Sequence, residues 1–191
     1  MLKDLITSRV RVKLLTLLLS NPDKIFHVRE IVRQIKEEIN AVRRELKHLE
    51  DKGYVSKEPR ANRLYYTFRK NHPIYFELLE LIAKTSGLGG DILKYKAKLG
   101  KIKFAMLSGK FVRRLAHNPS DVDLLLVGTV VLPELGQLVR QEETYRGREI
   151  NYTVMTEEEF IFRKKRKDQF ISEILLGARV MILGDEEELA A

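Results

Sequence analysis

The chain has 191 residues, of which 35 are lysine or arginine and 27 are aspartate or glutamate, so its formal net charge is +8. Hydrophobic residues make up 44% and charged residues 32% of the chain, a balance that is typical of a globular protein and excludes a disordered or collagen-like one. The absence of cysteine excludes disulfide bonds, thiolate metal sites and cysteine catalysis. The longest apolar run, residues 14–19, is too short to span a bilayer and no targeting segment is evident, so a cytoplasmic protein is expected.

The excess positive charge lies almost entirely in the first half of the chain. Residues 1–90 carry a net charge of +7, whereas residues 91–191 carry +1. Between the halves stand Gly87, Gly89 and Gly90, and glycine continues a helix poorly. We therefore expect two domains, over residues 1–86 and 101–191, with a linker and connecting helix over residues 87–100. A basic first domain favours an anionic partner.

Three short helices are predicted in the first domain. An apolar helix over residues 10–19 ends before Pro22, which cannot continue a helix. Apolar residues at helical spacing predict a second helix over residues 28–35. A third helix begins near Asn40, a favourable N-cap residue, and runs to residue 52, where Gly53 takes the position that glycine favours after a helix.

The third helix has one apolar and one basic face. Its apolar stripe must pack inward and consists of Ile39, Val42, Leu46 and Leu49. At about 100° per residue, the opposite face carries Asn40, Ala41, Arg44, Lys47 and His48. Such a short, basic, donor-rich face is typical of a recognition helix in the major groove of DNA, although an isolated basic face can also be solvated surface.

A basic β-hairpin is predicted after the third helix. Residues 54–57 and 63–68 form its strands, and residues 59–62 form the turn. The tip carries Arg60, Asn62 and Arg63, which can reach phosphates or a neighbouring groove.

Residues 8–70 resemble the ArsR/MarR-like winged helix-turn-helix transcriptional regulators of prokaryotes. The resemblance rests on the stretches 26–35 and 41–55, with their order of helix, turn, basic helix and hairpin. It implies an α+β winged-helix domain that binds double-stranded DNA. His27 and His48 are interpreted as cap or surface groups, and scattered histidines without cysteine speak against metal sensing.

A further amphipathic helix is predicted over residues 71–85. Its apolar stripe consists of Ile74, Leu78, Leu81 and Ile82, and it is widened by the following residues: Tyr75, Phe76 and Leu79. This surface can pack on the helix over residues 10–19 or form the interface of a homodimer. Regulators of this resemblance usually build dimers from their first and last helices, so a homodimer is the favoured interpretation.

The second domain is predicted to be an α/β domain with a mixed sheet. Strands are expected over residues 102–107, 122–127, 148–155 and 179–183, and helices over residues 133–142 and 156–176. Thr156 followed by Glu159 is a capping box, which marks the start of the last helical region.

An acidic pair stands in the middle of this domain. Asp121 and Asp123 are two residues apart on a predicted strand, so both carboxylates project from one face. Adjacent carboxylates repel each other unless a cation neutralises them, and Mg²⁺ does so in phosphoryl transfer. Ordinary acids at the edge of a strand are the alternative interpretation.

Residues 100–155 resemble the minimal nucleotidyltransferases of the DNA-polymerase-beta-like superfamily. Their pattern is Gly-Ser, a loop, Ser-Asp-x-Asp-Leu and a third carboxylate on a later strand, and residues 120–124 match it. The resemblance implies that Asp121 and Asp123 hold Mg²⁺ with a third ligand at the position of Asn151. It also implies that nucleotide-binding residues lie at the following positions: Gly109, Lys110 and Ser120.

Two departures from this pattern weaken the expectation of catalysis. Lys110 stands where the family has serine, and Asn151 stands where the third carboxylate is expected, unless the register brings Glu149 there. If the Lys110 ammonium reaches Asp121 or Asp123, it can supply the charge that a metal would otherwise supply.

Three functions are left open by the sequence. The favoured one is a sequence-specific DNA-binding transcriptional regulator whose nucleotidyltransferase-like domain is inactive and serves ligand sensing or interaction. The second is an active Mg²⁺-dependent enzyme that transfers a nucleoside monophosphate to a protein or small molecule. The third is an antitoxin-like partner protein. The expected partners are double-stranded DNA, a second copy of the chain, and a nucleotide effector or a small protein. No membrane partner is expected. Mg²⁺ and a nucleoside triphosphate are expected as cofactors only if the degenerate site still binds them.

Overall fold

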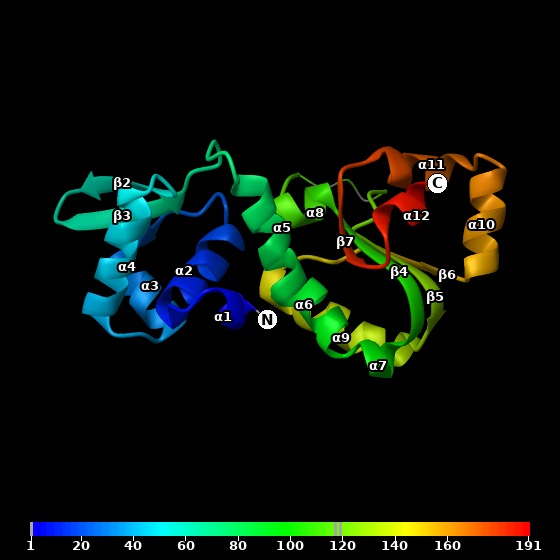
Figure 1. The fold of residues 1–191 in the computed structure, drawn as a ribbon, viewed down its shortest axis with the longest axis horizontal. Helices are drawn as coiled ribbons and strands as arrows, with labels where there is room; N and C mark the ends of the chain where they lie inside the picture. Colours follow the sequence, from blue (N-terminus) through cyan, green and yellow to red (C-terminus); the bar gives the residue numbers. More distant parts are fainter. Residues whose placement is uncertain (1, 117, 119) are drawn as a thin grey trace. The chain divides into compact units, whose positions relative to one another are not determined.

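A computed structural model describes residues 2–116, 118 and 120–191, and it divides the chain into two compact units, Met1–Ile82 and Ala83–Ala191 (Figure 1). Within the described residues, no helix has both the length and the apolar character needed to cross a membrane. The two units are described separately below.

The first unit combines helices with a small sheet. Its elements are α1 (Leu2–Leu5), α2 (Arg9–Leu19), β1 (Phe26–His27), α3 (Val28–Ile35), α4 (Ile39–Asp51), β2 (Val55–Arg60), β3 (Arg63–Phe68) and the greater part of α5 (Tyr75–Thr85). The three helices predicted from the sequence are therefore confirmed to within one residue at each end. Their apolar stripes supply the buried core, to which Leu14, Leu18, Ile31, Val42 and Leu46 contribute.

The turn between α3 and α4 gives the unit its helix-turn-helix geometry. It spans residues 36–38 and begins at Lys36, whose φ is +53°. The N-cap of α4 is Glu38, whose carboxylate accepts hydrogen bonds from the backbone N–H groups of Asn40 at 2.7 Å and Ala41 at 2.8 Å. These bonds lower the pKa of Glu38. The expectation that Asn40 caps this helix is wrong, because Glu38 already satisfies the free N–H groups.

The hairpin is longer and tighter than its sequence suggests. Strand β2 extends through Pro59 to Arg60, which pairs with Arg63, so the turn has two residues instead of four. Ala61 adopts a φ of +48° there. Pro59 is tolerated because β2 is an edge strand in the sheet order β1-β3-β2.

Helix α5 begins later than predicted, and its buried side chains all belong to the predicted stripe or to the residues that widen it. It starts at Tyr75, and its buried side chains are Tyr75, Leu79 and Ile82, whereas Ile74 precedes the helix and is 40% exposed. The ring of Tyr75 lies 5.8 Å from that of Phe68, centroid to centroid. The aromatic start of the helix therefore anchors it on the sheet.

The glycine-rich segment expected to be a linker is helical and belongs to the second unit. It forms α6 (Gly87–Lys94), which is followed by α7 (Lys96–Leu99). Gly89 is buried within α6, and a Cβ atom there would collide with the carbonyl oxygen of Ala83. The glycines therefore permit a close approach between α6 and the end of α5, and this packing outweighs their weak helix propensity.

A four-stranded mixed sheet forms the centre of the second unit. The remaining elements are β4 (Gly100–Ser108), α8 (Gly109–Arg113), β5 (Leu124–Val130), α9 (Leu132–Arg146), β6 (Tyr152–Met155), α10 (Glu157–Lys165), α11 (Gln169–Leu176), β7 (Arg179–Leu183) and α12 (Glu186–Ala190). The strand order is β6-β5-β4-β7, with β5 and β6 parallel and the other pairs antiparallel. The predicted mixed sheet is thus confirmed.

Helices cover this sheet through alternating apolar residues. Phe104, Met106, Leu125 and Val127 project to one face and pack with Phe160 of α10, together with residues of α11 and α12. The start of α10 is capped as predicted, because the Thr156 hydroxyl accepts a hydrogen bond from the Glu159 N–H at 3.1 Å.

Candidate functional site

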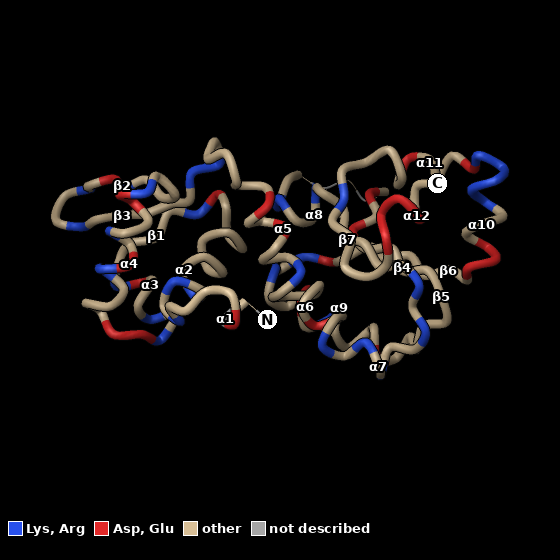
Figure 2. The backbone as a smooth tube through the Cα atoms, viewed as in Figure 1, with Lys and Arg blue, Asp and Glu red and all other residues tan. Residues whose placement is uncertain are grey.

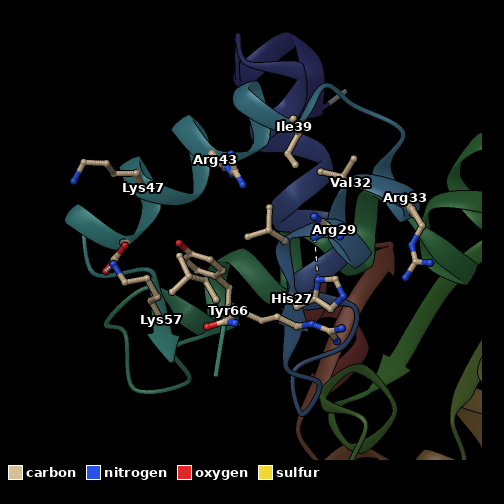
Figure 3. Close-up of a pocket in the computed structure, with 14 residues that line it drawn as sticks. His27, Arg29, Val32, Arg33, Ile39, Arg43, Lys47, Lys57 and Tyr66 are labelled. Atoms are coloured by element: carbon tan, nitrogen blue, oxygen red, sulfur yellow. Dashed lines mark hydrogen bonds and ion pairs between the residues drawn. The ribbon is translucent and has the colours of Figure 1, made fainter. Parts of the chain in front are cut away.

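A groove of about 1190 Å³ lies between α3, α4 and the hairpin of the first unit (Figure 3). Apolar side chains, among them Val32, Ile39 and Tyr66, form part of its wall. Tyr66 is 6% exposed, and this burial raises the pKa of its hydroxyl. Cationic side chains from four elements line the groove: Arg29, Arg33, Arg43, Lys47, Lys57 and Arg63. Glu50 is its one acidic side chain within the described residues.

Helical spacing explains how these cations converge. Arg29 and Arg33 are four residues apart on α3, and Arg43 and Lys47 are four residues apart on α4, so each pair shares one helix face. The α4 pair lies beside the buried stripe rather than opposite it, and it follows Ile39 on the same flank. Basic positions accordingly occur along α3 and α4 in the backbone view (Figure 2).

Most groove cations have no carboxylate partner. Among the described residues, no carboxylate oxygen lies within 4.0 Å of the side-chain nitrogens of the four exposed groove arginines Arg29, Arg33, Arg43 and Arg63. The two groove lysines are the exceptions. The Lys47 Nζ lies 3.3 Å from an Asp51 carboxylate oxygen. The Lys57 Nζ lies 2.7 Å from a Glu50 carboxylate oxygen, and this hydrogen bond raises the pKa of Lys57.

Cations of α2, in contrast, are paired. Arg9 lies 2.8 Å and Lys13 lies 2.6 Å from one oxygen of Glu37, and Arg11 lies 2.8 Å from Glu45. The cations of α2 are therefore neutralised within the first unit, whereas the groove arginines Arg29, Arg33, Arg43 and Arg63 are not, as far as the described residues show.

The residues predicted to bind DNA divide into two sets. Lys47, Asn62 and Arg63 line the groove. Asn40, Arg44 and His48 are exposed on the outer face of α4, where Ala41 is half-buried. Arg60 belongs to neither set. Its guanidinium donates two hydrogen bonds, at 2.9 and 3.0 Å, to the carboxylate of Glu58 on the same strand.

Four groove cations were not predicted: Arg29, Arg33, Arg43 and Lys57. The signal for the three arginines was present in the four-residue spacing of basic residues on α3 and α4, whereas Lys57 lies on β2 and has no such signal. The sequence-based prediction considered only the face of α4 directly opposite the core, whereas the groove lies beside the buried stripe of that helix.

His27 is a helix cap, as its interpretation from the sequence suggested. Its Nδ1 accepts hydrogen bonds from the backbone N–H groups of Arg29 at 3.0 Å and Glu30 at 3.4 Å. Because Nδ1 accepts, this arrangement requires that it carry no proton. The imidazole also borders the groove (Figure 3).

The acidic pair of the second unit does not lie on a strand. Strand β5 begins at Leu124, so Asp121 and Asp123 occupy the turn that precedes it. The expectation that both carboxylates share one face of a strand is wrong, since each has its own set of partners. Asp123 is 1% exposed, and the side chain of Asp121 is 21% exposed.

Asp121 is paired with Lys110. The Lys110 ammonium lies 2.9 Å from Oδ1 and 3.0 Å from Oδ2 of Asp121. The backbone N–H of Asn118 also donates to Oδ2 at 2.9 Å. The contact that the Lys110 substitution suggested is therefore present.

Asp123 is paired with Arg148, a residue that was not predicted. The two guanidinium Nη atoms donate to the two carboxylate oxygens, each at 2.9 Å. The Asn151 N–H adds a bond of 3.1 Å to Oδ2, while the Asn151 side-chain amide donates to the Asp121 carbonyl oxygen at 3.2 Å. Asn151 thus contributes hydrogen-bond donors at the position expected for a third carboxylate.

The predicted nucleotide-binding residues share a pocket of about 250 Å³. Gly109, Lys110 and Ser120 line it together with Asp121. However, the Gly109 N–H donates to the Ala178 carbonyl oxygen at 2.6 Å, so it is already occupied. A Cβ atom at Gly109 would lie 2.8 Å from the Ala178 side chain, which explains why glycine is needed there.

Known proteins were compared with the chain by family, by sequence and by structure. No protein-family model matches the chain, and no curated protein matches it. Among solved structures, the chain is similar to reduced HlyU from Vibrio cholerae N16961, with 21% sequence identity and a TM-score of 0.34. This likeness covers 44% of the present chain and 80% of the HlyU chain.

Proposed function

We propose that the first unit binds double-stranded DNA and that the chain is a sequence-specific transcriptional regulator acting in the cytoplasm. The observation that carries this proposal is the groove with four exposed arginines that have no carboxylate partner among the described residues. Neutralising DNA phosphates with such side chains releases condensed counterions and drives binding.

In this proposal the groove and the outer face of α4 contact different parts of the DNA. The groove cations Arg29, Arg33 and Arg43 hold a phosphate strand and so set the register of the protein on the duplex. The outer face of α4 enters the major groove of DNA, where Asn40 and Arg44 donate hydrogen bonds to base edges. In the same proposal, Arg63 and Asn62 of the hairpin contact neighbouring phosphates.

A homodimer belongs to the same proposal. One helix of 13 residues, α4, reads only a short stretch of bases, and a second copy would add a second half-site one helical turn away. Sedimentation at several protein concentrations, with and without DNA, tests this part.

The binding proposal is tested by anisotropy titrations of the full chain with labelled duplex DNA between 50 and 200 mM salt, roughly the range over which phosphate contacts show their effect. If each of the four arginines neutralises one phosphate, the logarithm of the association constant falls with a slope of about −3.6 against the logarithm of salt concentration. Selection from random duplexes then yields the preferred site. Absence of binding at the lowest salt, or a flat salt profile, would overturn the proposal.

We further propose that the second unit performs no nucleotidyl transfer and serves in ligand sensing or partner contact. The alternative, transfer of a nucleoside monophosphate, is favoured by the pocket that gathers Gly109, Lys110, Ser120 and Asp121. Incubation with labelled nucleoside triphosphates and Mg²⁺ distinguishes the two. Label transfer that disappears in Asp123→Asn would establish the enzyme.

A further inference from the structure

We propose that Lys110 and Arg148 take the place of a divalent metal ion in the second unit, so that its acidic pair is a metal-independent structural clasp. This inference is separate from the DNA-binding proposal. The nucleotidyltransferase resemblance implies Mg²⁺ at Asp121 and Asp123, and the described residues provide a direct test of that fit.

All four carboxylate oxygens face a cationic group of the chain. Arg148 donates to both oxygens of Asp123, and Lys110 lies within 3.0 Å of both oxygens of Asp121. Two negative charges therefore meet two positive charges. A bidentate guanidinium is the strongest form of such a pair and also sets its geometry.

A divalent ion does not fit this arrangement. Mg²⁺ demands oxygen ligands at about 2.0–2.1 Å in octahedral geometry, so it would have to displace both cationic side chains. The position expected for a third carboxylate holds Asn151, a neutral residue whose side-chain amide donates to the Asp121 carbonyl oxygen. Among the described residues, no group of three or more histidine, cysteine, aspartate or glutamate side chains is placed to hold a metal ion.

Arg148 is itself held in place by surrounding groups. Its Nη1 also donates to the Glu149 carbonyl oxygen at 2.7 Å, and its guanidinium carbon lies 5.5 Å from the centre of the Phe111 ring. The guanidinium carbon of Arg146 lies 3.6 Å from the same ring centre. The cation opposite Asp123 is therefore a fixed part of the fold rather than a mobile surface group.

The clasp joins three segments that are distant in sequence. Lys110 stands on α8, Asp121 and Asp123 precede β5, and Arg148 lies between α9 and β6. Beside it, the Asp123 N–H donates to the Asn151 carbonyl oxygen at 2.7 Å, where the parallel pairing of β5 with β6 begins. The clasp thus holds the start of the central strand without any bound ion.

The test compares the full-length wild type with Lys110→Met, Arg148→Met and the double variant. Arg163→Met serves as the matched control, because Arg163 pairs with Glu159 on an exposed face of α10. Thermal unfolding is recorded in EDTA and in millimolar Mn²⁺, and Mn²⁺ binding is measured by electron paramagnetic resonance.

The wild type and the control are expected to unfold at the same temperature with and without Mn²⁺, and to bind no Mn²⁺ at this site. The double variant, whose carboxylates are released, is expected to unfold at a lower temperature in EDTA and to regain stability with Mn²⁺, since a ligand that binds only the folded state stabilises it. Its Mn²⁺ signal should disappear when Asp123→Asn is added.

Mn²⁺ binding by the wild type that is lost in Asp123→Asn would overturn the proposal. It would also be overturned by a double variant that folds and binds no Mn²⁺, because the carboxylates then form no cation site without these side chains. Should the double variant fail to fold, the wild-type and Asp123→Asn titrations decide the question by themselves.

Discussion

The groove of the first unit and the acidic pair of the second unit differ in whether their charged side chains are paired. In the groove, four exposed arginines have no carboxylate partner among the described residues. At the acidic pair, every carboxylate oxygen faces a cation of the same chain. Unmatched charge on a surface is available to a charged partner, whereas a charge inside the fold needs a counter-ion from the chain itself.

Burial accounts for this difference. The groove arginines are exposed, so water solvates them and leaving them unpaired costs little. Asp123 is 1% exposed, and a carboxylate removed from water to that extent is stable only with a close counter-ion and hydrogen bonds. The comparison predicts that the same kind of substitution has different effects in the two units.

Arg148→Met is expected to have the largest effect. Removing one partner of a buried ion pair leaves an uncompensated charge, and this costs about 3–5 kcal/mol of unfolding free energy. Urea unfolding followed by circular dichroism measures the loss, and hydrogen exchange of β5 amides assigns it to the second unit. Arg163→Met, which breaks an exposed pair, should cost about 1 kcal/mol or less. Equal losses in the two variants would contradict the comparison.

Arg44→Ala is expected to weaken DNA binding without affecting stability. Arg44 lies on the outer face of α4, so its loss should cost about 1–3 kcal/mol at the preferred site and relax specificity at one base position. Competition titrations with single-base variants of that site measure both effects. Arg9→Ala, on α2, is the control. A uniform loss over all sequences would instead place Arg44 on a phosphate.

Arg43→Ala is expected to produce that uniform loss. Because we propose that Arg43 contacts a phosphate, its loss should weaken binding to all duplexes alike and make the salt slope shallower by about 1. The salt titrations described above provide the measurement. An unchanged salt slope would show that Arg43 contacts no phosphate, and that this wall of the groove does not face the DNA backbone.

Glu50→Gln is expected to strengthen DNA binding. Glu50 is the one acidic side chain among the described groove residues and pairs with Lys57. Neutralising it releases the Lys57 ammonium and makes the salt slope steeper by about 0.9. The substitution also removes the group that raises the pKa of Lys57. Weaker binding by this variant would show that the pair positions Lys57 rather than masking it.

Glu37 is expected to give the smallest effect, which is seen only in acid. The hydrogen bond from Lys13 holds its pKa below the ordinary value of 4.5. Its contribution to stability is therefore present above the pKa of the unfolded chain and is lost as the pH falls through the lowered pKa of the folded state. Unfolding temperatures of wild type and Glu37→Gln, measured from neutral pH to below pH 4.5, should converge at the acid end.

Much of the fold could be predicted because its signals are local. The apolar spacing of α2, α3 and α4, with Pro22 and Gly53 as end signals, places these helices within one residue. The helical state of Gly89 could not be predicted in this way. It depends on the contact with the Ala83 carbonyl, and propensity alone points to a break.

The candidate sites show the same division. The sequence indicates Lys110 as a partner of the acidic pair because a lysine stands there in place of the serine of the nucleotidyltransferase pattern. Arg148 lies 25 residues from Asp123 in the sequence, and the two side chains meet only because β6, which follows Arg148, pairs with β5, which follows Asp123. In the groove, one step of helix rotation separates Arg43, which lines it, from Arg44, which does not.

The sequence by itself determined the helices of the first unit, the mixed strand content of the second and the concentration of positive charge in residues 1–90. These follow from the apolar period, the turn residues and the composition, all of which are properties of neighbouring residues. Only the tertiary structure decided which charges meet. The pairing of Arg148 with Asp123 and the unpaired arginines of the groove arise from the packing of distant segments, because ion pairs depend on separation in space rather than along the chain.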